Sequence, residues 1–101
     1  MIVGTVLFHI APGKNAEAMD YLRKISKQIT TVTKVEYRLM VRLGGAAGQV
    51  ALSGETKTMA DWDAARKKSA ADATTQKMIA KAGADGLFIP GSVQMGIWEI
   101  V

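Results

Sequence analysis

The chain has no cysteine and only one histidine among its 101 residues. The lack of cysteine excludes disulfides, thiolate nucleophiles and thiolate metal sites together, and it suits a reducing compartment, so we expect a cytoplasmic protein. A single histidine with scattered carboxylates gives no spacing typical of metal ligands. We expect no metal site, and we expect no cofactor.

Long apolar runs and dense charge clusters are missing too. No stretch approaches the roughly 18 apolar residues that suggest a membrane span. The first residues also lack the pattern of a signal peptide, which is a charged segment followed by an apolar run and a cleavage site. We therefore expect neither secretion nor a membrane. The net charge is +4, but the basic run at residues 66–68 is flanked by aspartates and lacks an aromatic platform. Nucleic acid is therefore not an expected partner.

What is present is typical of a folded protein. The sequence is 49% apolar and 22% charged, as in ordinary globular chains. Its length fits one domain, residues 1–101, and so short a domain buries a small share of its surface. A partner subunit would help to stabilise it.

Residues 1–10 alternate in a way that predicts a strand with two largely apolar faces. One face carries Ile2, Gly4, Val6, Phe8 and Ile10, and the other carries Val3, Thr5, Leu7 and His9. A strand of this kind needs cover on both faces, so we expect helices on one side and a second layer on the other.

The rest of the chain predicts three more strands and two long helices. Helical spacing begins near Asn15 and fades over the β-branched residues 30–33. Strands are expected at 35–43 and 49–56, joined by a glycine-rich turn at 44–48. A second helix is expected from Thr58, with a bend or restart at Asp72 and an end at Gly83. Residues 93–101 predict an apolar fourth strand in a buried central or interface position.

Two short segments in this order of elements carry a family resemblance. Ile-Ala-Pro-Gly-Lys at 10–14 closes the first strand, and Met-Ala-Asp-Trp at 59–62 opens the second long helix. The chain resembles the dimeric α/β-barrel superfamily, above all its antibiotic-biosynthesis-monooxygenase-like and NIPSNAP-like proteins. The resemblance implies an α+β, ferredoxin-like β-α-β-β-α-β fold whose four-stranded antiparallel sheet pairs with a second copy, giving a homodimeric α/β barrel.

His9 and two arginines are the candidate catalytic or anion-binding residues. His9 is the one side chain whose ordinary pKa lies near neutrality, so it is the simplest general acid or base; the alternative is a structural histidine. Arg38 and Arg42 share a strand face and could bind a carboxylate or an enolate. They could equally pair with Glu55 and Glu99 across a barrel.

Three aromatic residues are the candidate ligand contacts. Trp62 falls where haem-degrading members of the superfamily often carry a functional tryptophan, but the helix histidine of those enzymes is missing here. Trp62 could instead be a core anchor. Tyr37 is expected on the helix-facing side of its strand, and Trp98 in the fourth strand. With His9 and Arg38, these rings are expected to line an apolar space between sheet and helices.

The resemblance leaves several functions open. The first hypothesis is a small-molecule-binding dimer that acts as a cofactor-independent monooxygenase or isomerase on an aromatic or polyketide-like substrate. The second is a non-catalytic ligand-binding or stress-related dimer. A third, weaker hypothesis is a haem-degrading monooxygenase. The expected partners are a second copy of the chain and a small apolar or aromatic ligand.

Overall fold

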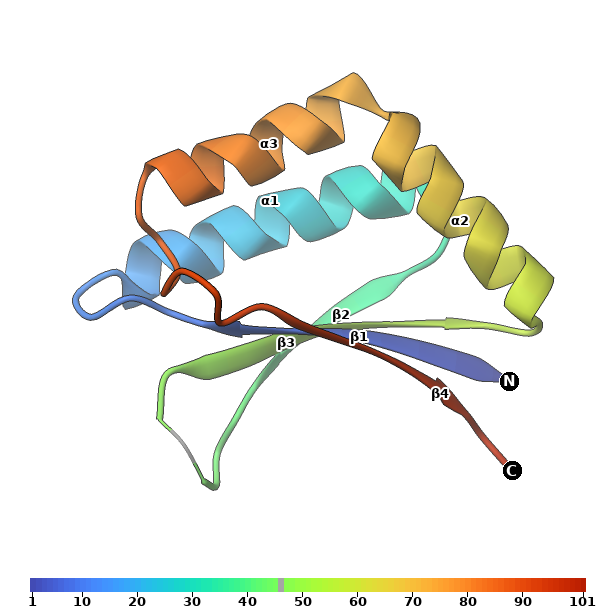
Figure 1. Cartoon of the computed structure of the whole chain (residues 1–101), viewed down its shortest axis with the longest axis horizontal. Coiled ribbons are helices and arrows are strands. Elements are labelled where there is room, and N and C mark those ends of the chain that lie inside the picture. The colour runs from blue at the N-terminus through green and yellow to red at the C-terminus, as the bar shows by residue number, and fades with distance from the viewer. Residues whose placement is uncertain (46) are drawn as a thin grey trace.

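The computed structural model describes residues 1–45 and 47–101. Its elements follow the chain as β1 (Ile2–His9), α1 (Asn15–Thr33), β2 (Tyr37–Val41), β3 (Gln49–Thr56), α2 (Met59–Ala71), α3 (Ala73–Ala84) and β4 (Gln94–Glu99). The strands form one antiparallel sheet in the order β2-β3-β1-β4 (Figure 1). This is the predicted ferredoxin-like α+β fold. The predicted turn at 44–48 includes Ala46, which lies outside the described residues.

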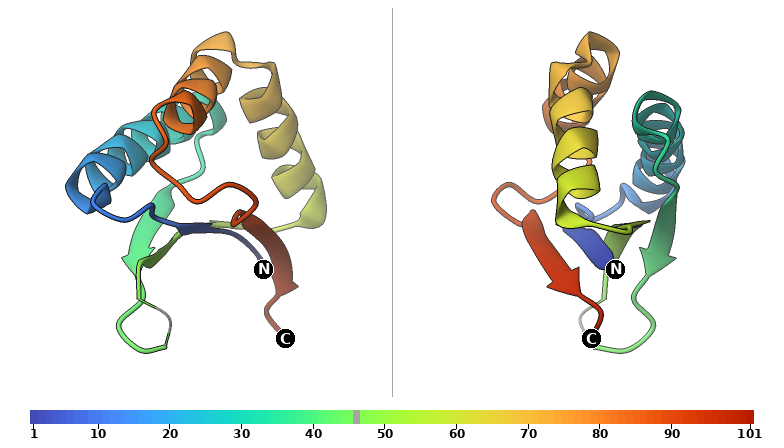
Figure 2. Two further views of the ribbon diagram at one scale, coloured as in Figure 1. Left: turned by 60° about the vertical axis from the view of Figure 1, so that its left-hand side comes forward. Right: turned by 90° about the vertical axis from the view of Figure 1, so that its right-hand side faces the viewer.

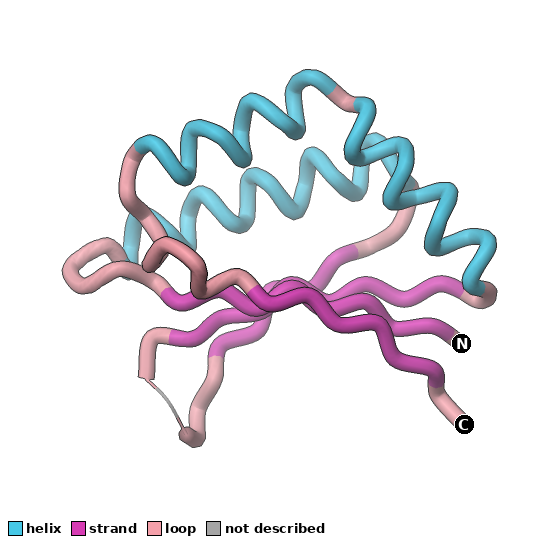
Figure 3. Tube along the Cα trace, in the orientation of Figure 1, coloured by secondary structure: helices cyan, strands magenta, loops and turns pink. Residues whose placement is uncertain are grey.

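All three helices pack on one side of the sheet. Figures 2 and 3 show them above the strands, while no described element covers the opposite side. We call the two sides the helix-covered face and the bare face. Because side chains alternate along a strand, each strand contributes to both faces. No helix of the described chain is long and apolar enough to cross a membrane.

Helix α1 forms because its apolar residues recur on one side. Ala18 and Leu22 are fully buried, and Ile25 follows one turn later. The helix ends where Lys34 takes a left-handed conformation, with φ at 63°, and its N–H donates to the Thr30 carbonyl at 2.8 Å. The β-branched exit predicted for residues 30–33 is confirmed.

The second helical segment is split into α2 and α3 by a capping residue, as the sequence predicts. The Thr58 side chain accepts from the Asp61 N–H at 3.1 Å and caps α2. Asp72 then caps α3 by accepting from the Thr75 N–H at 2.9 Å and from its hydroxyl at 2.6 Å. The same carboxylate accepts from the Gln28 amide at 3.1 Å, which ties the break to α1.

The helix ends one residue beyond Gly83, where its end was expected. Helix α3 runs through Gly83 to Ala84, and the left-handed residue is Gly86, with φ at 65°. Gly86 is free to take this conformation because it has no Cβ. Its turn carries Leu87 down into the core, where that side chain is 2% exposed.

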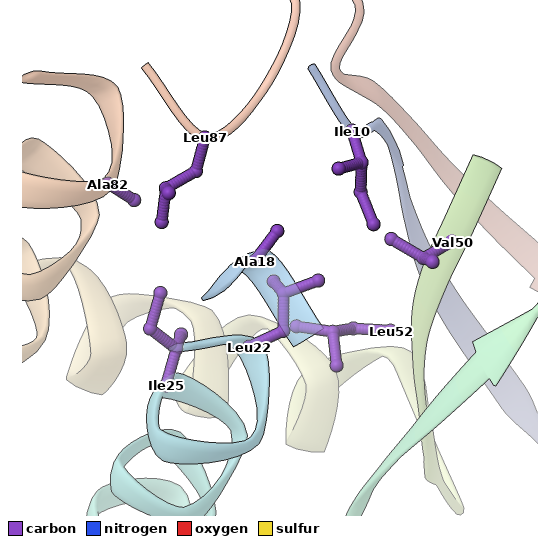
Figure 4. Packing of buried hydrophobic residues seen from close by; sticks show 8 residues of the cluster. All are labelled: Ile10, Ala18, Leu22, Ile25, Val50, Leu52, Ala82 and Leu87. Carbon is purple, nitrogen blue, oxygen red and sulfur yellow. The ribbon is translucent and has the colours of Figure 1, made fainter. Parts of the chain in front are cut away.

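The core lies where α1 and α3 meet the sheet and the loop after α3. Figure 4 shows its side chains converging from all these elements. Its buried members are Ile10, Ala18, Leu22, Ile25, Val50, Leu52, Ala82 and Leu87. The core sits wholly on the helix-covered face.

The prediction of a central, buried fourth strand is wrong for the single chain. β4 lies at the sheet edge and pairs only with β1. Its large residues are exposed, with Met95 at 75% and Trp98 at 65%. An apolar strand fits a central place and an interface equally well, and the order of the sheet excludes the first. The interface position stays a prediction.

Candidate functional site

Two glycines make a floor without side chains on the helix-covered face. Gly4 of β1 and Gly54 of β3 are direct cross-strand partners, so both present bare backbone to the same side. A Cβ added to Gly4 would fall among the ring atoms of Trp62, and one on Gly54 would lie 2.9 Å from the ring of Tyr37. The two aromatic rings therefore rest directly on the sheet backbone.

Tyr37 and Trp62 form a tilted pair above this floor. Their ring centroids are 6.4 Å apart and their planes meet at 49°. Trp62, in the first turn of α2, is 8% exposed. The Tyr37 N–H donates to the Thr30 hydroxyl at 3.4 Å, and its carbonyl accepts from the Ser26 hydroxyl at 3.3 Å. Both ends of the Tyr37 backbone are thus held by α1.

The Tyr37 hydroxyl is a partly desolvated donor. Burial raises the pKa of Tyr37 above its ordinary value of 10.0, so the phenol stays protonated over the physiological range. No hydrogen bond of this hydroxyl is found among residues 1–45 and 47–101. A neutral phenol in this setting can donate a hydrogen bond to a ligand.

Tyr37 also faces a cleft between α1 and the outer edge of β2. This α1–β2 cleft has a volume of about 480 Å³, within the range of about 300 to 1,000 Å³ typical of small-molecule sites. Tyr37 and Leu39 supply its apolar wall, and α1 supplies its polar side. The polar lining residues are Asp20, Arg23, Lys24, Ser26 and Lys27.

The other predicted site residues lie on the bare face. His9 pairs with Gln49, Arg38 with Ser53 and Trp98 with Val3, which puts all three on the side away from the helices. The expectation that they share one space with Tyr37 and Trp62 is therefore wrong. The reason is the two-residue period of strands, since Tyr37 and Arg38 are consecutive and must point to opposite faces.

His9 is held through its backbone at the end of β1. Its N–H donates to the Ser92 hydroxyl at 3.3 Å, and its carbonyl accepts from the Ile89 N–H at 2.8 Å. The half-buried imidazole lies beside Gly48, where an added Cβ would be 3.3 Å from Nε2. Among the described residues no side chain hydrogen-bonds to this ring. This geometry fits both a catalytic and a structural histidine.

The two arginines differ in their surroundings. Arg42 donates from Nε to the Gly44 carbonyl and from Nη1 to the Gln49 amide oxygen, both at 2.6 Å, so it holds its own hairpin. The Arg38 side chain is exposed and hydrogen-bonds to no described residue. The described ion pairs join neighbours three or four residues apart, and none involves Arg38 or Arg42. Pairing with Glu55 or Glu99 does not occur within the described chain.

A small hollow indents the bare face near this hairpin. Its volume is about 210 Å³, and its lining is largely apolar: Leu7, Met40, Val41, Arg42, Gln49, Val50 and Ala51. It lies on the same side as His9 and Arg38. No described group of three potential metal ligands lies there or elsewhere.

Sequence reasoning missed the glycine floor and the α1–β2 cleft. The floor depends on the cross-strand partnership of Gly4 and Gly54, which are 50 positions apart in the sequence. One signal was present, because each glycine interrupts the apolar side of its strand. The cleft depends on how α1 lies over β2. Its only signal in the sequence was the four-residue spacing of two cations, Arg23 and Lys27, on α1.

Comparisons with solved structures show the fold. A NIPSNAP domain protein from Burkholderia xenovorans has a TM-score of 0.80 at 17% identity, covering 100% of this chain and 95% of its own. A NIPSNAP family protein from Agrobacterium tumefaciens has a TM-score of 0.79 at 22% identity, covering 99% and 92%. A protein from Deinococcus radiodurans, provisionally named an antibiotic biosynthesis monooxygenase, has a TM-score of 0.74 at 11% identity, covering 100% and 93%.

These neighbours confirm the predicted resemblance at the level of the fold. No family model matches the sequence, and no curated protein matches it. At identities of 22% or less the likeness carries no residue roles. The chain has the fold of NIPSNAP and antibiotic-biosynthesis-monooxygenase-like proteins, and its chemistry must be argued from its own side chains.

Proposed function

We propose that this protein is a homodimeric small-molecule-binding protein that acts as a cofactor-independent monooxygenase or isomerase on an aromatic or polyketide-like substrate. One observation carries the ligand-binding part: Tyr37 and Trp62 are fixed on a glycine floor beside a cleft of about 480 Å³. The names of several structural neighbours support the monooxygenase part.

The Tyr37 ring suits a flat, apolar ligand. A tyrosine ring offers a large, rigid contact area and stacks or packs edge-on against other rings, and the buried Trp62, which does not line the cleft, packs against it. The backbone hydrogen bonds of Tyr37 and the N-terminal turn of α2 hold the two rings at a defined angle. The free phenol hydroxyl adds one polar contact that can orient an oxygen of the substrate.

The homodimer is proposed from the bare face. This face carries apolar side chains that no described element covers, among them Val3, Leu7, Met40, Ala51 and Trp98. Apolar side chains left uncovered on one face of a sheet favour an interaction site there. A second copy, presenting the same face, would form the predicted barrel.

Catalytic roles for His9 and Arg38 are part of this proposal. In a dimer joined through the bare faces, both side chains would lie inside the barrel, with Arg42 at the hairpin end. His9 would serve as the general base, and Arg38, whose β3 partner Ser53 lies four positions from the Gln49 partner of His9, would hold an anionic part of the substrate away from the reacting atoms. A substrate served by these residues would sit inside the barrel, across the sheet from Trp62, so the α1–β2 cleft would hold a second ligand and not the reacting molecule.

In the non-catalytic interpretation, the protein binds a ligand beside the same aromatic pair but does not convert it. The haem interpretation finds less support, because the only imidazole lies on the face opposite Trp62. A haem stacked near Trp62 would have no histidine beside it.

Oxygen uptake and fluorescence binding with a panel of hydroxylated aromatics test the proposal. The Trp98→Phe variant leaves Trp62 as the single tryptophan, so its emission reports binding beside Tyr37. Saturable oxygen consumption that falls about a hundredfold in His9→Gln supports the enzyme. Binding with neither oxygen consumption nor chemical conversion of the bound compound favours the non-catalytic dimer, and no binding by any member of the panel overturns the proposal.

A further inference from the structure

The α1–β2 cleft carries a charge pattern that the aromatic pair does not explain. Its lining includes three cations, Arg23, Lys24 and Lys27, and one carboxylate, Asp20. Lys24 pairs with Asp20 at 3.3 Å, so these two charges largely offset each other. Arg23 and Lys27 form no ion pair among the described residues. Two uncompensated cations therefore border the cleft.

The positions of these two cations favour one ligand between them. Arg23 and Lys27 are four residues apart on α1, so their side chains leave the same side of the helix about one turn apart. Arginine binds carboxylates through a planar pair of N–H donors, and lysine adds a point charge. Both are exposed at the rim, where they remain accessible from solvent.

The β2 wall of the cleft consists of one aliphatic and one aromatic side chain. Leu39 and the Tyr37 ring are half-buried and line the β2 side. The Tyr37 hydroxyl has no partner among the described residues, and burial keeps it protonated. A ligand that fits this lining has a flat apolar body and one anionic group.

We propose that the α1–β2 cleft binds an amphipathic organic carboxylate, whose anionic end lies between Arg23 and Lys27 and whose apolar body packs on Leu39 and Tyr37. This inference rests on the ligand-binding part of the proposed function and names the chemical class of the ligand. The carboxylate accepts hydrogen bonds from the two cations, and the Tyr37 hydroxyl donates to a polar atom on the body.

The test compares two probes with the same ring system, one anionic and one uncharged. Titration calorimetry measures 2-naphthoate and its uncharged amide, 2-naphthamide, against the full chain at low ionic strength. We expect naphthoate to bind at least about tenfold more tightly, because charge-assisted hydrogen bonds are the stronger ones. Raising the salt should shrink this preference, since the rim cations are exposed.

Three variants and one matched control locate the effect. Arg23→Gln and Lys27→Gln should each weaken naphthoate binding about five- to tenfold and leave naphthamide unchanged. Lys67→Gln, which removes the same charge from α2 outside the cleft, is the matched control and should change neither affinity. Tyr37→Phe should weaken both probes by a smaller factor, because it keeps the ring and loses the donor.

The outcomes separate this inference from the proposed function. Equal affinity for the two probes, or equal losses in Lys67→Gln and Arg23→Gln, overturns the assignment of an anionic ligand to the cleft. If hydroxylated aromatics still bind beside Trp62 in that case, the proposed function stands without it. If naphthoate and the hydroxylated aromatics all fail to bind, both are overturned.

Discussion

The two faces of the sheet are built from the same four strands, yet they follow different rules. On the helix-covered face, the size of each side chain matches the space beneath the helices. Leu52 fills its space and is 3% exposed, and Gly4 leaves room for the Trp62 ring. On the bare face, charged, small and apolar residues are mixed, and Met40 and Trp98 stand exposed. The helix-covered face is buried by its own chain except along β4, where Met95 and Ile97 lie on this face and stay exposed. The bare face exposes apolar side chains that a partner would bury, and it also carries His9 and Arg38, the candidate catalytic residues.

The largest effect should come from filling the glycine floor. Gly4→Val places a branched side chain where the Trp62 ring lies, so the ring must leave its site. We expect a loss on the order of 5 kcal/mol in the free energy of unfolding, from lost burial together with overpacking. Urea denaturation measures it.

Gly83→Ala is the matched control for that substitution. Gly83 lies in α3, and an added Cβ would have no neighbour within 4 Å. Alanine should therefore be neutral or stabilise by up to about 1 kcal/mol. Similar losses in the two variants would show that the close approach of Trp62 to Gly4 does not matter.

The two tryptophans give the most direct contrast between the faces. Trp62→Ala should cost about 3 to 5 kcal/mol, because its ring is buried in the single chain. Trp98→Ala should cost much less in a dilute monomer and should weaken self-association instead. This reverses the order that an apolar fourth strand suggests from sequence. Equal melting temperatures for Trp62→Ala and the parent protein would contradict the burial of Trp62.

A smaller, pH-dependent effect should appear at Asp72, on the helical side. Hydrogen bonds from Thr75 and then Gln28 lower the pKa of Asp72 below its ordinary value. Its stabilisation is therefore complete above the unfolded-state pKa of about 3.9 and is lost as the pH falls through the lower pKa of the folded state. Asp72→Asn should melt at a lower temperature than the parent protein at neutral pH.

Thermal melts of both proteins between pH 7 and pH 2 check this sign. The gap between their melting temperatures should close only in the acidic range. A gap that stays constant down to pH 2 would mean that the carboxylate charge plays no part in capping α3.

The sequence predicts local features of this fold well and long-range ones poorly. Alternation in β1 separates His9 from Phe8, and capping chemistry marks Thr58 and Asp72, because each of these signals lies within a few residues. The edge position of β4 is not local, since apolar residues suit a central strand and an interface alike. The floor under Trp62 likewise depends on strand register.

The same difference between local and long-range features holds for the candidate site. The orientation of Tyr37 toward the helices could be predicted from its strand period, and it is confirmed by its contact with Gly54 and Trp62. Its separation from Arg38 follows from that same period, although the sequence interpretation placed both in one space. The α1–β2 cleft could not be predicted, because it exists only where the flank of α1 meets the edge of β2.

Leu7 allows the bare face to be changed without altering the core. Leu7→Glu adds a charge to the bare face next to the hollow lined by Met40 and Ala51. It should leave the fold of the single chain intact by circular dichroism and reduce self-association strongly, since like charges would meet across a symmetric interface. Loss of secondary structure instead would show that Leu7 serves the chain's own core.

Sedimentation equilibrium of the unmodified protein at micromolar concentration tests most directly whether a second copy covers the bare face. We predict a species of twice the chain mass, which Leu7→Glu converts to the monomer and Lys67→Gln leaves unchanged. A monomer mass for the unmodified protein across the micromolar range would contradict it.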